Sequence, residues 1–217
     1  MKDNAPIIYQ FAFLGDSEVG KTSIFRKMIT GNFTGNAIST LGIEKKTISY
    51  TDLYVENKGN KYQKNFEVSI FDTAGQEKYR AITRNYIKGS DGVVLVYDIT
   101  NKQSFEHVET WLDSILEILS DWNYSNYLII LLGNKLDLIG QEEENRRVKT
   151  IEAKNLCDKK GILWGGECSA KDFTAEQFSD LFKDLTINIF NKVGEKQIAK
   201  QHSKKIGKYK KKSKGCC

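Results

Sequence analysis

The 217-residue chain is long enough for one sizeable hydrophobic core, and its 40% hydrophobic and 28% charged residues are typical of a soluble globular domain. Its net charge of +5 comes from its end, because residues 195–217 hold nine lysines and one acid, which leaves the preceding residues acidic. This distribution argues against a nucleic-acid-binding body and favours an interaction of the tail with an anionic surface. No apolar run approaches the roughly 18 residues that a membrane-spanning helix needs.

The predicted elements alternate between strand and helix along the chain. A short apolar run at residues 9–14 predicts a buried strand, and helical spacing follows at residues 22–29. Residues 44–71 predict two long strands around a turn at residues 57–60, in which glycine would adopt a positive φ. Continuous apolar runs predict further strands, covered on both faces, at residues 92–97 and 127–132, and another strand is expected from residue 162.

Two amphipathic helices are predicted by apolar stripes of helical period. The stripes consist of Phe105, Val108, Trp111, Leu112, Ile115, Leu116 and Leu119, and of Phe178, Leu181, Phe182, Leu185 and Ile189. The alternation predicts an α/β fold, a single domain with a doubly wound, mostly parallel six-stranded sheet and one antiparallel edge hairpin. We assign residues 1–7 to an N-terminal extension, 8–193 to the domain and 194–217 to a disordered, lysine-rich tail.

The first motif, Gly-Asp-Ser-Glu-Val-Gly-Lys-Thr at residues 15–22, follows a predicted strand and opens a helix, as a phosphate-binding P-loop requires. Glycines let backbone N–H groups turn towards phosphate oxygens, and the helix N-terminus favours anions. Lys21 is expected to reach the β- and γ-phosphates, and the Thr22 hydroxyl to hold Mg²⁺. The alternative is a glycine-rich turn with a chance lysine. The predicted phosphate-binding residues are Gly15, Asp16, Ser17, Glu18, Val19, Gly20, Lys21, Thr22 and Ser23.

Two motifs that follow later strands indicate guanine as the base. Asn134-Lys135-Leu-Asp137 follows the strand at 127–132, and the Asp137 carboxylate can accept hydrogen bonds from both guanine N–H groups. Adenine offers no such donor pair, and a buried acceptor without partners costs about 1–3 kcal/mol. In the second motif, backbone N–H groups can meet the guanine carbonyl oxygen. This motif comprises Ser169, Ala170 and Lys171 after Cys168. Either tetrapeptide alone would more often be a solvated turn.

The remaining motif residues point to the γ-phosphate and to hydrolysis. Asp72, at the end of the hairpin, is placed to support Mg²⁺, and Gly75 can present its N–H to the γ-phosphate. Gln76 can orient the attacking water, so that Gln76 and Lys21 are the expected catalytic residues. The Thr40 hydroxyl is expected to bind Mg²⁺ only with a γ-phosphate present, which would order its loop. A capped loop entering a helix is the alternative for residues 72–77.

These motifs resemble those of the Ras superfamily of small GTPases and, within it, the Rab family, over roughly residues 8 to 193. The family segments are Gly-Asp-Ser at residue 15, Tyr-Arg-Ala-Ile-Thr at 79–83 and the run at 89–100. The terminal Cys216-Cys217 behind a lysine-rich linker is similar to Rab endings that carry geranylgeranyl groups on both cysteines. By the same resemblance, Phe33 is expected to pack on the guanine. Rho-, Arf- and Ran-like patterns fit less well.

Three features depart from the Rab pattern. Lys45 stands where Rab proteins present the first residue of an exposed aromatic triad, whose other members correspond to Phe71 and Tyr86. The hairpin is longer than usual and follows this surface in chain order, so it is a candidate for a replacement contact; a longer solvated tip is the alternative. Trp-Gly-Gly at residues 164–166 is expected to interrupt the strand before Cys168.

The resemblance implies a GTP/GDP-binding switch of a P-loop GTPase domain, which hydrolyses GTP slowly, uses Mg²⁺ and recruits effectors in vesicle trafficking. The implied partners are a GTPase-activating protein, an exchange factor, a GDP-dissociation inhibitor, a prenylation escort and effectors. The protein is expected to be monomeric and to cycle between the cytosol and the cytoplasmic face of intracellular membranes. The alternatives are a pseudo-GTPase scaffold, against which Thr40, Gly75 and Gln76 argue, and an unlipidated soluble GTPase.

Overall fold

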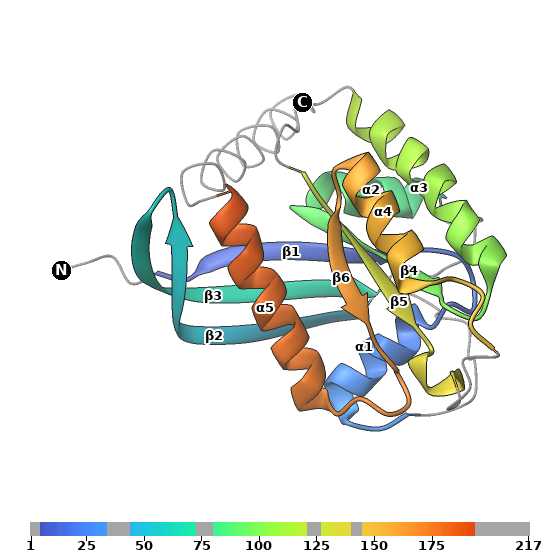
Figure 1. Ribbon diagram of the computed structural model, residues 1–217. Coiled ribbons are helices and arrows are strands. Elements are labelled where there is room, and N and C mark those ends of the chain that lie inside the picture. Colours follow the sequence, from blue (N-terminus) through green and yellow to red (C-terminus); the bar gives the residue numbers. More distant parts are fainter. Residues whose placement is uncertain (1–4, 34–43, 73–79, 121–126, 140–144, 194–217) are drawn as a thin grey trace, which may run out of the picture.

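The computed structural model describes residues 5–33, 44–72, 80–120, 127–139 and 145–193. Its centre is a six-stranded sheet in the order β2-β3-β1-β4-β5-β6, in which only the β2–β3 pair is antiparallel (Figure 1). The strands are β1 (Ile7–Leu14), β2 (Glu44–Asn57), β3 (Asn60–Asp72), β4 (Gly92–Asp98), β5 (Leu128–Asn134) and β6 (Leu163–Glu167). The predicted fold class is therefore confirmed. β1 begins at Ile7, within the range assigned to the N-terminal extension.

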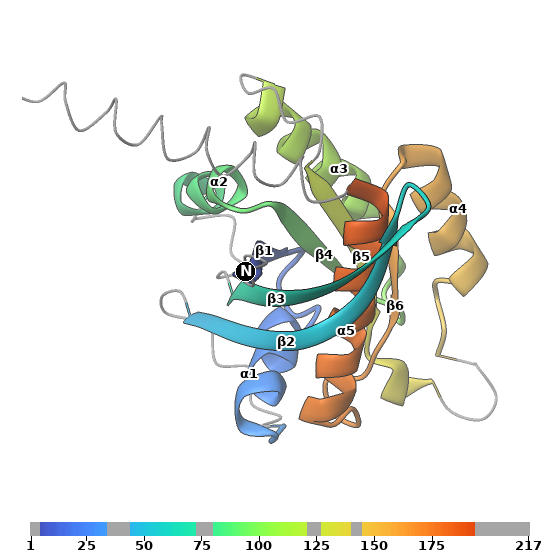
Figure 2. The ribbon, with the colours of Figure 1, turned by 90° about the vertical axis from the view of Figure 1, so that its left-hand side faces the viewer.

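Helices cover both faces of the sheet and enclose two cores (Figure 2). The helices are α1 (Lys21–Thr30), α2 (Arg80–Gly89), α3 (Lys102–Ser120), α4 (Thr150–Lys160) and α5 (Ala175–Val193). α1 and α5 contribute to one core, whereas α2, α3 and α4 contribute to the other. Within the described residues, no helix is long and apolar enough to cross a bilayer.

The predicted apolar stripes match the buried faces with one exception. In α3, Phe105, Val108, Leu112, Ile115 and Leu119 are buried. Leu116 is 60% exposed, so its assignment to the buried stripe is wrong. It lies at the edge of the stripe, where the helix surface turns away from the sheet.

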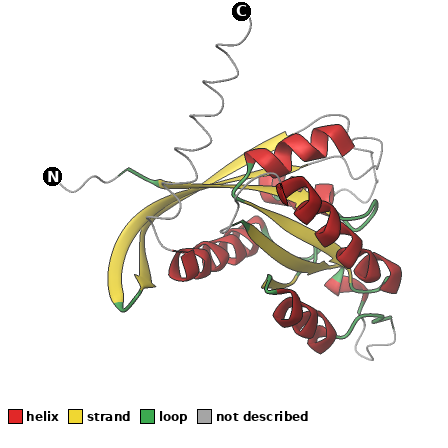
Figure 3. Ribbon diagram, turned by 90° about the horizontal axis from the view of Figure 1, so that it is seen from above, coloured by secondary structure: helices red, strands yellow, loops and turns green. Residues whose placement is uncertain are grey.

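The β2–β3 hairpin is the longest pairing in the sheet, and its strands continue beyond the first β1–β3 pair, Ile7 with Phe66 (Figure 3). Lys58 and Gly59 join the strands with φ of 52° and 77°, the positive values that a tight two-residue hairpin turn requires. Lys45 lies at the other end of β2, and the twelve residues to Asn57 span about 40 Å of strand. The tip therefore cannot supply a contact beside Lys45, contrary to the expectation from chain order.

The Trp-Gly-Gly segment at residues 164–166 was expected to interrupt the strand before Cys168. It lies within β6 instead, and the strand bulges there without ending. β6 pairs with β5 on both sides of a register shift between Leu131 and Gly133. Gly166 takes a φ of 93° at this irregularity. The strand thus continues to Glu167 and delivers Cys168 to the same end of the sheet as the other parallel strands.

Candidate nucleotide site

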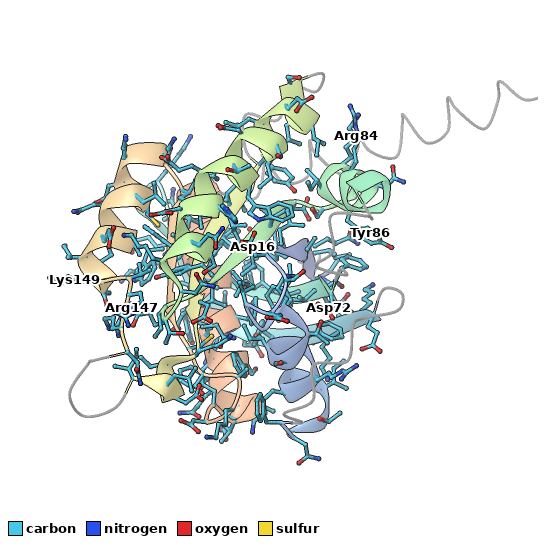
Figure 4. All side chains as sticks on the ribbon, turned by 90° about the vertical axis from the view of Figure 1, so that its right-hand side faces the viewer. Asp16, Asp72, Arg84, Tyr86, Arg147 and Lys149 are labelled. Atoms are coloured by element: carbon cyan, nitrogen blue, oxygen red, sulfur yellow. The ribbon has the colours of Figure 1, made fainter. Side chains whose placement is uncertain are left out.

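The predicted motifs converge at the carboxyl ends of the parallel strands, where open α/β sheets bind ligands. The loop after β1 leads into α1, β3 ends at Asp72, and the loops after β5 and β6 carry the base motifs. Figure 4 looks at this side of the molecule, with Asp16 and Asp72 labelled. Thr40, Gly75 and Gln76 lie outside the described residues, as do Cys216 and Cys217.

The phosphate loop depends on glycine at its two ends. Gly15 has a φ of 132°, and a Cβ there would lie 2.2 Å from the Val96 carbonyl oxygen of β4. Gly20, at the N-cap of α1, has a φ of 96°, and a Cβ there would lie 2.2 Å from Asn134 Nδ2. A side chain at Gly15 would push the loop off the sheet, and one at Gly20 would collide with the Asn134 amide. Between them Glu18 takes a φ of 65°, which is unusual for a residue other than glycine.

Lys21 is the buried cation of the phosphate loop, with only 4% of its surface exposed. Its Nζ donates to the Gly15 carbonyl oxygen at 2.8 Å and to that of Asp16. Burial lowers the pKa of Lys21 to about 8, although the carboxylates of Asp72 and Asp16 oppose this shift. The ammonium is therefore mostly charged at neutral pH and lies within the loop, where a phosphate would stabilise it.

Asp16 joins the phosphate loop to α3, a contact that the sequence did not suggest. Its Oδ2 lies 2.6 Å from His107 Nδ1, and its Oδ1 accepts a hydrogen bond of 2.9 Å from Trp111 Nε1. The carboxylate is thus held at α3, while the backbone of Asp16 stays in the loop. The position of Trp111 at the margin of an apolar stripe was the one feature of the sequence that could have indicated this contact. A partly buried indole N–H usually has a hydrogen-bond acceptor.

Asn134 connects the phosphate loop with the loop after β6. It is 1% exposed, its Nδ2 donates to the Val19 carbonyl oxygen at 2.8 Å, and its Oδ1 accepts from the Ala170 N–H at 3.1 Å. Beside it, the Asp137 Oδ1 accepts a 2.8 Å hydrogen bond from the Ser169 hydroxyl. These contacts bring the two predicted base motifs together and fix them to the phosphate loop.

Lys135 and Lys171 complete the side of the site assigned to the base. Lys135 takes a φ of 72°, and its Nζ lies 2.7 Å from Asp98 Oδ2 at the end of β4. The Lys171 carbonyl oxygen accepts from Lys27 Nζ at 3.2 Å, so that the second half of α1 lies against this loop. Phe33, which follows α1, is 40% exposed.

The donor set at the phosphate end fits Mg²⁺. Asp72 is fully buried at the end of β3, and the half-buried Thr22 lies in the first turn of α1. Carboxylate and hydroxyl oxygens are the hard ligands that Mg²⁺ binds, usually together with water and substrate phosphates. In the described part of the chain, no cluster of three or more His, Cys, Asp or Glu side chains could hold a metal ion. The two residues therefore fit an ion whose other ligands come from a nucleotide and from water.

The three residues of the expected effector surface lie together. The rings of Phe71 and Tyr86 have centroids 5.5 Å apart, and Lys45 Nζ lies 5.7 Å from the Phe71 centroid. Tyr86 is labelled in Figure 4. An ammonium and two aromatic rings thus share one surface beside the Asp72 end of β3.

Comparisons with known proteins place most of the chain in one family. The family model described as the Ras family matches residues 10–191. The Ras-related protein RABA4a of Arabidopsis thaliana is 36% identical over 200 residues, covering 92% of this chain and 80% of that protein. The Ras-related protein Rab11A of Lotus japonicus is 37% identical over 206 residues, covering 94% and 82%. The Ras-related protein Rab11C of Nicotiana tabacum is 38% identical over 192 residues, covering 88% and 78%.

Proposed function

Because the chain belongs to the Rab group of the Ras family of small GTPases, we propose that its strand-end loops bind GTP and GDP with Mg²⁺ and that its tail anchors it to membranes. Membership makes the chain a GTP-binding switch of vesicle trafficking that hydrolyses GTP. Beyond this membership, we propose the roles of the individual residues, the binding of Mg²⁺ and the membrane anchor.

The observation that carries the nucleotide assignment is the position of Asn134. Its amide holds Val19 of the phosphate loop on one side and Ala170 of the base loop on the other. A ligand with phosphates at one loop and a base at the other therefore meets a single preformed unit. Preformed geometry favours binding because less conformational freedom is lost when the ligand arrives.

Base selectivity is assigned to Asp137, whose carboxylate lies at the base loop beside Ser169. The purified protein should bind GDP and GTP in preference to ATP by several orders of magnitude. Asp137→Asn should weaken guanine binding and favour xanthine nucleotide, because an amide can donate to the carbonyl that xanthine carries. Displacement of a fluorescent GDP measures both effects, and equal competition by ATP would refute the assignment.

Turnover is assigned to Gln76 and Lys21. Lys21 would hold the β- and γ-phosphates, and Gln76 would orient the attacking water. The motifs contain no arginine that could stabilise the transition state, so intrinsic GTP hydrolysis should be slow, on the order of 10⁻⁴ s⁻¹. An arginine supplied by a partner protein should raise this rate about 10⁵-fold. Thr22, Thr40 and Asp72 would hold Mg²⁺, which neutralises phosphate charge when bound.

Gln76→Leu should leave GTP affinity nearly unchanged and lower hydrolysis, because it removes the group proposed to orient the attacking water and leaves the phosphate loop intact. Single-turnover assays with and without an activating protein measure both quantities. Wild-type hydrolysis by this variant in both assays would contradict the assigned role and would favour another means of positioning the water.

The membrane anchor is proposed from Cys216 and Cys217 with the lysines before them. One lipid chain binds a bilayer only marginally, whereas two chains, or one chain with basic residues, bind stably. An escort for prenylation and a dissociation inhibitor that extracts the lipids would be the corresponding partners. Replacing both cysteines by serine should move the protein to the cytosolic fraction of cells. A double mutant that still sediments with membranes would favour a different anchor.

A further inference from the structure

The tip of the β2–β3 hairpin, defined here as residues 54–64, lies at the end of the sheet opposite the nucleotide loops. β1 pairs with β3 only from Phe66 onward, so the tip strands pair with each other beyond the rest of the sheet. The tip bends towards the C-terminal end of α5 (Figures 1 and 2). A bulge between Tyr50 and Leu53, with Asp52 at a φ of 55°, marks the point where the hairpin changes its course.

Three hydrogen bonds and one aromatic contact fix the tip to the last turns of α5. Asn57 Nδ2 donates to the Asn191 carbonyl oxygen at 2.7 Å and to that of Phe190 at 3.2 Å. The Glu56 N–H donates to Asn191 Oδ1 at 2.8 Å. Tyr62 packs edge-to-face on Phe190 with ring centroids 6.0 Å apart. Because carbonyl groups at a helix end need such partners, the tip serves as a cap of α5 and has a fixed position beside it.

The tail therefore begins next to the tip. α5 ends at Val193, two residues after Asn191, and residues 194–217 follow with nine lysines and the two terminal cysteines. In any conformation, a stretch of 24 residues spans at most about 80–86 Å. A membrane anchor at Cys216 and Cys217 would thus keep the tip near the bilayer without setting its orientation.

The hairpin tip exposes side chains on both of its faces that suit the interface of an anionic bilayer. Tyr54 is 77% exposed on the face away from α5, whereas Tyr62 lies opposite Val55 on the face towards α5, where it packs on Phe190 and is 37% exposed. Lys58 and Lys61 are exposed at the turn, and Lys64 Nζ lies 6.0 Å from the Tyr62 ring centroid. Tyrosine is enriched where one end of a side chain is apolar and the other is wet, and lysine extends an apolar stem towards anionic head groups.

We propose that the hairpin tip is a membrane-contacting surface that rests on an anionic leaflet once the tail is anchored, and this proposal rests on the anchoring proposed above. Glu56 in the tip and Asp52 just before it offset two of the three tip lysines, so the tip is a weak binder that should not recruit the protein alone. Tethering raises its effective concentration at the bilayer to the millimolar range, where weak contacts become populated. The nucleotide loops, at the opposite end of the sheet, then face away from the membrane.

An experiment can separate this contact from lipidation in cells by attaching the anchor chemically. GDP-loaded full-chain protein is coupled through Cys216 and Cys217 to vesicles that carry a maleimide lipid. The other two cysteines should react slowly, because Cys157 and Cys168 are buried and burial raises the pKa of Cys157 to about 11. Vesicles of phosphatidylcholine alone are compared with vesicles that also contain phosphatidylserine.

Hydroxyl-radical footprinting of Tyr54 and Tyr62 reports the contact, with Leu116 of α3, which is 60% exposed, as an internal reference. Oxidation of Tyr54 should slow several-fold on the anionic vesicles only, and that of Tyr62, which Phe190 already covers in part, should slow less, while Leu116 stays unchanged. The variant Lys58→Gln/Lys61→Gln should lose most of this protection. The matched control Lys154→Gln/Lys159→Gln, which removes the same charge from exposed positions of α4, should keep it.

Three outcomes would overturn the proposal. No protection on either vesicle means that the tip does not touch the bilayer. Equal protection on both vesicles means that tethering alone covers the tip, without recognition of anionic lipid. Protection by a soluble protein fraction in place of vesicles points to a protein partner. Failure of the cellular anchor would appear separately, as a wild type that fractionates like the double serine variant.

Discussion

Lys21 is a buried lysine whose pKa of about 8 lies well below its ordinary value of 10.5. Phosphate charges stabilise the ammonium and should raise this pKa again when GDP binds. At pH 7 the group is mostly protonated with or without GDP, whereas near pH 9 binding should take up a large fraction of one proton. Calorimetry of nucleotide-free protein in buffers of different ionisation enthalpy measures this uptake. Absence of proton uptake at pH 9 would contradict the position of Lys21 beside the phosphates.

Glu18 places an acidic side chain and a left-handed backbone inside the phosphate loop. A carboxylate near the phosphates should weaken GDP binding, and a left-handed conformation costs about 1–2 kcal/mol for a residue other than glycine. Glu18→Gly should therefore slow GDP release and raise the free energy of unfolding. Glu18→Gln removes the charge and keeps the strain, so it should slow release without the gain in stability. Stopped-flow release of fluorescent GDP, with chemical denaturation, distinguishes the two contributions.

Helix α3 holds the Asp16 carboxylate through His107 and Trp111. Trp111→Phe removes the donor to Oδ1 while keeping an aromatic ring, so the carboxylate should approach the phosphates and GDP should leave faster. Asp16→Asn removes the charge that causes the repulsion. The effect of Trp111→Phe on release should consequently be smaller in the Asp16→Asn background, which a double-mutant cycle measures. Equal effects in both backgrounds would mean that Trp111 acts only through packing.

Helix α5 connects the hairpin with the core of the sheet through Phe190, which is 1% exposed and packs on Tyr62 and Phe66. Phe190→Ala should lower the free energy of unfolding by about 3–5 kcal/mol, because it leaves a cavity among aromatic rings. Chemical denaturation measures the loss. Ile151→Ala, on the exposed surface of α4, is the control and should change stability by no more than about 0.5 kcal/mol.

At the scale of the whole molecule, two of the three departures from the Rab pattern, Lys45 and the hairpin tip, lie at opposite ends of the hairpin. Lys45 adjoins Phe71 and Tyr86, whereas the tip contacts α5. A hydrophobic pocket in an effector would have to desolvate the Lys45 ammonium, so common Rab effectors should bind the wild type poorly. Lys45→Phe alone should raise their affinity in the GTP state by about tenfold, as expected for an aromatic contact worth about 1.4 kcal/mol.

Removal of the hairpin tip should leave that affinity unchanged, since the tip lies about 40 Å of strand away from Lys45. Isothermal titration of wild type, Lys45→Phe and a tip-shortened variant with one Rab effector compares the three. Binding by the wild type as tight as that of Lys45→Phe would show that Lys45 does not limit effector choice.

The sequence by itself determined the order and type of the elements, because strand and helix periods and glycine-bearing turns are local properties of the chain. It also placed the motifs at strand ends, and a parallel sheet necessarily brings such ends to one edge. Trp-Gly-Gly was misread as an interruption because glycine signals a bulge as readily as a break.

Only the tertiary structure decided which side chains join these loops. Asn134 meets Val19 across 115 residues, Asp16 meets His107 across 91, and Asn57 meets Asn191 across 134. No periodicity or spacing encodes such pairs, since they depend on how the sheet orders its strands and how α3 and α5 pack on it. The exposure of Leu116 follows from the same packing, whereas the distance between Lys45 and the hairpin tip follows from the rise of the extended strand β2.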